Sequence, residues 1–183
     1  IGSFREETYR RHERIFIMLA ITALICTVVL SLTQGIRPFL LLCFISLLGI
    51  LYNTRIFPSH WRFRSAKELP GSKNVSMSLA WAMVTAILPT VGAGFHFSSG
   101  MVVAFSFSAA IVFIRSVMSD VLDVQNDRLL GQETIPVIFG YKTAQRIVKV
   151  IWLYLVFLLA LAFPLGWTSS VSFALLICLF YGL

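Results

Sequence analysis

Long uninterrupted apolar segments alternate with short polar connections along the chain. Residues 74–114 contain no Asp, Glu, Lys or Arg, and residues 150–183 contain none either. Because the hydrocarbon core of a bilayer requires about 20 apolar residues per helix, each region is long enough to cross twice or nearly so. Polarity does not alternate over short segments here, which argues against a transmembrane barrel. The pattern therefore predicts an all-α, polytopic transmembrane helical bundle.

Turn residues divide this bundle into about six expected spans. Breakers such as Gln34-Gly35, Gly92-Ala93-Gly94 and Pro164-Leu165-Gly166 separate the apolar runs. The spans expected between them cover residues 15–32, 38–57, 75–97, 101–119, 147–167 and 170–183. The chain begins with Ile and ends inside an apolar run. We therefore expect a single transmembrane domain over residues 1–183, truncated at both ends.

Composition and charge strengthen the membrane interpretation. Of the 183 residues, 58% are hydrophobic and only 13% are charged, which excludes an ordinary soluble domain. All of the 15 Lys and Arg residues except Arg37 lie before residue 15, within 53–74, or within 115–149. By the positive-inside rule, these three connections face the cytoplasm. This predicts an integral protein of the cell (inner) membrane, embedded in the lipid bilayer, whose net charge of +7 requires no nucleic-acid partner.

Three of the eight acidic residues lie in one short segment, residues 119–131, directly after an apolar run. On a continuous helix, Asp120, Asp123 and Asp127 fall within an arc of about 60°. Carboxylates on one face repel each other unless a cation lies among them, and such oxygens suit Mg²⁺ that shares a phosphate. The alternative is a solvated helix end whose acids balance Arg115 and Arg128.

The acidic segment also carries a family resemblance. It reads Asp120-x-x-Asp123-x-x-x-Asp127-Arg128, followed by Gly131, Thr134, Pro136, Val137 and Gly140. This closely resembles the second aspartate-rich motif of the UbiA superfamily of intramembrane prenyltransferases, of the 4-hydroxybenzoate polyprenyltransferase type. A weaker resemblance covers Tyr52, Lys67, Pro70, Lys73, Asn74 and Trp81.

The resemblance implies a bundle of about nine helices in which Mg²⁺, held between two aspartate-rich motifs, binds the diphosphate of a polyprenyl donor. Carried over to this chain, Asp120, Asp123 and Asp127 are the implied catalytic and metal-binding residues. The family's first motif, of the form NDxxDxxxD, does not occur here and is expected to precede the first span. The implied activity is Mg²⁺-dependent transfer of a polyprenyl group from an allylic polyprenyl diphosphate to an aromatic or lipid-type acceptor.

The resemblance also implies a set of substrate-binding residues near the same membrane face: Tyr52, Arg55, Lys67, Lys73 and Arg128. The family often has a Tyr-x-x-x-Lys element at this place, but Ile56 stands where the lysine is expected. The lysine's role therefore passes to Arg55 or Lys67. Positive side chains would stabilise departing diphosphate, although the positive-inside bias accounts for the same lysines equally well.

Two other classes of function remain open from the residues alone. An ion-coupled transporter would also use intramembrane carboxylates, but transporter acids usually lie near the bilayer midplane on broken helices. The acids here lie at a helix end beside a basic loop, which favours prenyl transfer. A scaffold or receptor without catalysis would keep its function after substitution of Asp123.

Overall fold

The computed structural model describes residues 2–54, 69, 71–94, 96–129, 133–169 and 171–181. Within these residues the chain forms helices and turns and no strand, so the predicted all-α bundle is confirmed. Arg55 and Lys67, two of the predicted substrate-binding residues, lie outside the described residues, as does Gly131 of the aspartate-rich motif.

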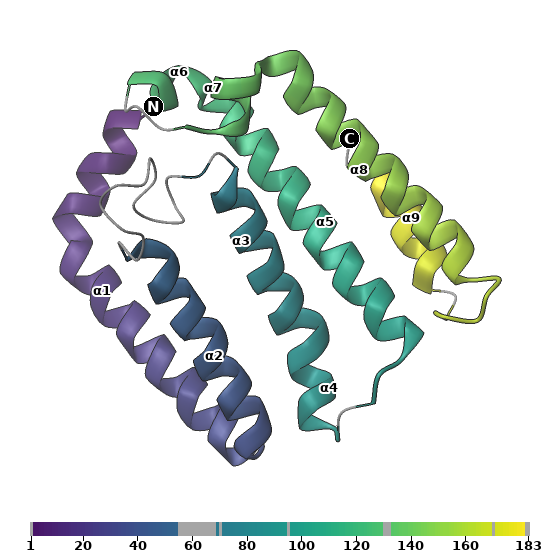
Figure 1. Ribbon diagram of the computed structural model, residues 1–183. Helices are drawn as coiled ribbons and strands as arrows, with labels where there is room; N and C mark the ends of the chain where they lie inside the picture. The colour runs from purple at the N-terminus through teal and green to yellow at the C-terminus, as the bar shows by residue number, and fades with distance from the viewer. Residues whose placement is uncertain are drawn as a thin grey trace, which may run out of the picture.

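The helices lie side by side in a curved row and reverse direction from one long helix to the next (Figure 1). In chain order they are α1 (Gly2–Thr33), α2 (Ile36–Asn53), α3 (Ser72–Ala82), the π-helical turn η2 (Met83–Ile87), α4 (Leu88–Gly92), α5 (Ser99–Leu122), α6 (Val124–Leu129), α7 (Ile135–Phe139), α8 (Tyr141–Ala162) and α9 (Val171–Tyr181).

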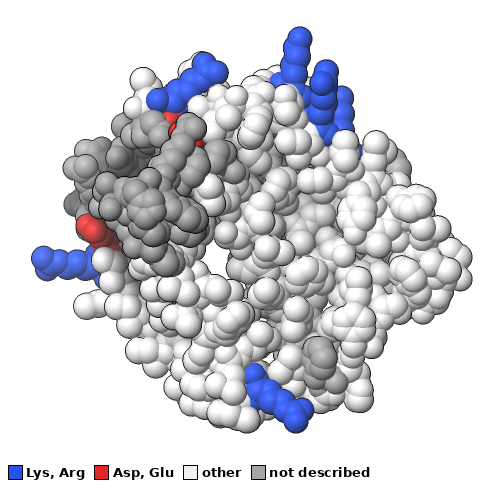
Figure 2. All heavy atoms as spheres, in the orientation of Figure 1, with Lys and Arg blue, Asp and Glu red and all other residues white. Residues whose placement is uncertain are grey.

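Four of these helical segments are long and apolar enough to cross a membrane: His12–Thr33, Ser72–Gly92, Ser99–Leu122 and Tyr141–Ala162. Of the other two expected spans, one is the shorter apolar helix Ile36–Tyr52, and the other corresponds to the 11 residues described for α9. Figure 2 shows a broad belt without Lys, Arg, Asp or Glu on the visible face, with basic side chains at its edges. The protein is therefore an integral membrane protein.

The ends of α8 differ from the prediction. The apolar run predicted a span over residues 147–167, whereas the helix begins at Tyr141 and ends at Ala162. Its first two turns carry Lys142 and Arg146, which hydropathy alone excludes from a span although they favour helix. Pro164 follows the helix end, and Gly166 takes the left-handed conformation with φ 68°.

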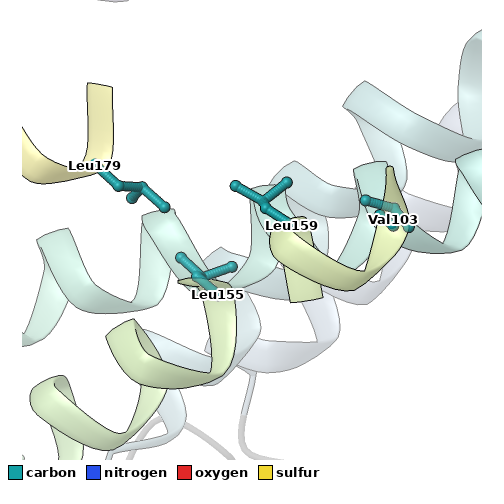
Figure 3. Close-up of a cluster of buried hydrophobic side chains, with 6 residues drawn as sticks. Val103, Leu155, Leu159 and Leu179 are labelled. Atoms are coloured by element: carbon teal, nitrogen blue, oxygen red, sulfur yellow. The ribbon is translucent and has the colours of Figure 1, made fainter. Parts of the chain in front are cut away.

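Two apolar clusters hold the second half of the bundle together. In the first, Val103 of α5, Leu155 and Leu159 of α8 and Leu179 of α9 pack together (Figure 3). The second lies nearer the end of the bundle where α5 finishes, and consists of Val117, Ile135, Ala144 and Val148. Because Ile135 belongs to this second cluster, α7 is fixed between α5 and α8.

Gly100, at the opposite end of the bundle, packs closely against the turn that follows α8. A Cβ added at Gly100 would lie 2.9 Å from the backbone carbonyl oxygen of Trp167, which is not free to move like a side-chain tip. We expect Gly100→Ala to destabilise the protein by about 1–3 kcal/mol, seen as a lower Tm in detergent. Gly49→Ala is the matched control, because nothing lies within 4 Å of its added Cβ. A Tm for Gly100→Ala equal to or above that of Gly49→Ala would contradict this packing.

Candidate active site

The polar side chains of interest gather at one end of the bundle. The end of α2, the start of α3, the end of α5 and both short helices α6 and α7 lie at this end (Figure 1). Tyr52 lies in the last turn of α2, Lys73 and Asn74 in the first turn of α3, and Asp120 in the last turn of α5. Helices α3 and α5 are in extensive contact, which brings their polar residues together.

Asp120 is buried, with 3% of its surface exposed, and both of its carboxylate oxygens are hydrogen-bonded. Lys73 Nζ donates to Oδ1 at 3.0 Å, and Asn74 Nδ2 donates to Oδ2 at 2.9 Å. The negative charge of Asp120 is therefore balanced by a lysine of another helix, rather than by Arg115 or Arg128 as the solvated-end alternative supposed. A charge-assisted pair of this kind fixes the position of both groups.

Asp123 differs from the other two aspartates in its surroundings. The prediction assumed one continuous helix, but α5 ends at Leu122 and Asp123 has φ −97° and ψ 8° before α6 begins. Backbone bonds from Asp123 N to Ser119 O and from Asp127 N to Asp123 O keep the spacing of one helical turn. Asp120 and Asp127 are nevertheless buried while Asp123 is exposed, so the three carboxylates do not share one environment.

Asp127 is held by the segment that precedes α7. The buried hydroxyl of Thr134 donates to its Oδ2 at 3.2 Å. The next residue, Ile135, packs against Gly71, where an added Cβ would lie 2.9 Å from the Ile135 side chain. Gly71 also has φ 72°, a conformation that favours glycine. The contact joins the segment that holds Asp127 to the start of the helix that carries Lys73.

Tyr52 lies close to the same helix start, because its hydroxyl and that of Ser72 are 3.2 Å apart. The structure therefore brings Lys73 and Asp120 into contact and places Tyr52 beside the residue preceding Lys73. Arg128 is exposed on α6. From the sequence, Asn74 and Thr134 were named only as residues of the resemblance, without a role, and Ser116 was not named. A polar residue one turn before Asp120 in an apolar span is a usable signal for Ser116.

The three carboxylates do not form a preassembled metal site of protein ligands alone. Among the residues that the structure describes, no three His, Cys, Asp or Glu side chains form a group that could hold a metal ion. Mg²⁺, however, often binds through only one or two carboxylates, and takes its other ligands from water and substrate phosphate. Asp123 and Asp127 are one helical turn apart in the backbone, and Asp123 is exposed to water, so these two residues supply the ligand types of such a site.

The chain is similar in sequence to known prenyltransferases. The profile described as the UbiA prenyltransferase family matches residues 10–183. The chain is also similar to a Humulus lupulus protein named 2-acyl-4-prenylphloroglucinol 6-prenyltransferase, chloroplastic, at 26% identity over 102 residues. This match covers 55% of the chain but 24% of the relative, so the chain spans about a quarter of the relative's length. No solved structure matches the chain.

Proposed function

Because the chain belongs to the UbiA prenyltransferase family, we propose that it transfers a polyprenyl group from an allylic polyprenyl diphosphate to an acceptor, with Mg²⁺ at the acidic end of α5 and α6. The observation that carries this proposal is the ion pair between Lys73 and Asp120, one helical turn from Asp123. It places a cation beside a row of carboxylates at one end of the bundle. Bound Mg²⁺ and a fixed ammonium group are both suited to a diphosphate.

In the proposed reaction, the bond between the allylic carbon and the diphosphate oxygen breaks, and its electron pair leaves with the diphosphate. The acceptor then forms a bond to that carbon and loses a proton to water or to the released diphosphate. Asp123 and Asp127 would hold Mg²⁺, which when bound neutralises charge on the leaving diphosphate. Lys73 binds the same anion, and Thr134 keeps the Asp127 carboxylate in place.

The name of the relative supports one acceptor class, and the charge pattern supports one side of the membrane. The hop protein is named for prenylation of a phloroglucinol, which supports an aromatic acceptor, with a lipid-type acceptor as the alternative. The basic residues at the ends of the apolar segments support a position of the acidic end on the cytoplasmic side, in our proposal that of the cell (inner) membrane.

Release of diphosphate tests the proposal. The full-length protein, purified in detergent, is supplied with geranylgeranyl diphosphate and an aromatic acceptor, with Mg²⁺ or with EDTA. We expect release in Mg²⁺ and a loss of about 100-fold or more in EDTA, because the leaving group then carries its full charge.

The opposite result has a clear meaning. A protein that neither binds nor cleaves geranylgeranyl diphosphate contradicts prenyl transfer, and proton or Na⁺ flux in proteoliposomes then tests the transporter alternative.

A further inference from the structure

A chain of three hydrogen bonds runs between α5 and α3 and ends at Lys73. Ser116 of α5 donates from Oγ to Asn74 Oδ1 of α3 at 3.0 Å. The amide of Asn74 then donates from Nδ2 to Asp120 Oδ2 of α5 at 2.9 Å. The other oxygen of Asp120 accepts from Lys73 Nζ at 3.0 Å. The hydrogen bonds therefore lead from α5 to α3, back to α5, and again to α3, where they end at the ammonium group.

The four members of this chain differ sharply in exposure. Asn74 is 1% exposed, Ser116 5% and Asp120 3%, whereas the side chain of Lys73 is 56% exposed. A lysine ammonium has three N–H donors, and the bond to Asp120 uses one of them. The buried part of the chain is thus anchored between two packed helices, and its exposed end keeps donors for a second anion.

We propose that Ser116 and Asn74 are positioning residues that hold Asp120 as the counter-ion of Lys73, so that the ammonium is fixed in place for the diphosphate of the donor. This inference rests on the proposed function. It assigns Asp120 to Lys73 and leaves Mg²⁺ to Asp123 and Asp127. The two engaged oxygens of Asp120 are the reason for this division of roles.

The physical advantage lies in preorganisation. Lysine has a long, flexible side chain, and a ligand that must order it loses affinity for that reason. Asp120 limits this freedom only if its own carboxylate is fixed, and Asn74 fixes it from the buried side. Ser116 in turn holds the oxygen end of the Asn74 amide, so that the N–H end points at the carboxylate. Replacing Ser116 should therefore weaken binding of the donor only because Lys73 is then held less firmly.

A double-mutant cycle tests this in the full-length protein with geranylgeranyl diphosphate as donor. We expect Ser116→Ala to raise KM for the donor about three- to tenfold with little change in kcat. Lys73→Met should raise KM about 30-fold or more. In the Lys73→Met background, Ser116→Ala should change KM by less than about twofold, since the group it positions is absent.

Ser78→Ala is the matched control. Like Ser116, Ser78 is buried, but it lies on α3 and its hydroxyl donates to the carbonyl of Val75 in its own helix. We expect a similar Tm to that of Ser116→Ala and an unchanged KM. Binding of inorganic diphosphate, measured by calorimetry, should weaken in Ser116→Ala and not in Ser78→Ala.

The outcomes separate this inference from the proposed function. Equal effects of Ser116→Ala with and without Lys73 overturn the positioning role, as does inorganic diphosphate binding that is unchanged by Lys73→Met. If the wild type still releases diphosphate from geranylgeranyl diphosphate in these cases, prenyl transfer stands. A wild type that neither binds inorganic diphosphate nor cleaves the donor overturns both.

Discussion

Asp127→Asn is expected to lower the rate of diphosphate release about 100-fold or more while the protein remains folded. The substitution keeps the size of the side chain and an oxygen that can accept from Thr134 Oγ1. It removes the negative charge that, in our proposal, binds Mg²⁺ together with Asp123. Because Asp127 is buried, with 8% of its surface exposed, water replaces the lost ligand poorly. The measurement is diphosphate release from geranylgeranyl diphosphate across a range of Mg²⁺ concentrations.

Glu133→Gln is the control for this prediction. Glu133 is exposed and lies beside Thr134, so its replacement makes the same change of charge at the same end of the bundle. We expect its rate to stay within about twofold of the wild type, as for most surface substitutions away from a site. If Asp127→Asn and Glu133→Gln have the same rate and the same Mg²⁺ dependence, Asp127 does not bind the metal.

The membrane-spanning segments follow from the sequence because hydropathy acts over a whole helix. Four of the expected spans have helices that are long and apolar enough to cross a bilayer. Helix ends are decided by a few residues instead, and here the prediction was less accurate. For example, α8 begins at Tyr141, so Lys142 and Arg146 lie in the helix although they lie outside the apolar run. Their aliphatic stems and good helix propensity make this compatible with the membrane edge.

For the site, too, the sequence predicted one part and not another. The spacing of Asp120, Asp123 and Asp127 singled them out, because acids are rare next to apolar spans. Which of them is buried depends on the break after Leu122, and helical periodicity does not predict a break. The partners of Asp120 depend on how α3 and α5 are aligned along their length. That alignment places Asn74 between Ser116 and Asp120, and it arises from side-chain packing rather than from any local pattern.

Lys73→Met is expected to destabilise the protein, and adding Asp120→Asn is expected to recover part of the loss. Without Lys73, the buried Asp120 carboxylate keeps its bond from Asn74 but has lost its ionic partner, at a cost of about 1–3 kcal/mol. Asn at position 120 removes that charge and retains an oxygen that accepts from Asn74. The matching measurement is Tm in detergent for the wild type, each single variant and the double variant.

Activity should behave differently from stability in the same four proteins. The double variant regains part of its stability but has no ammonium group for the diphosphate, so we expect its KM for the donor to stay about 30-fold or more above the wild type. Such a result separates the contribution of the ion pair to folding from its contribution to donor binding. Recovery of both Tm and KM in the double variant would mean that Lys73 only balances Asp120, and that other groups bind the diphosphate.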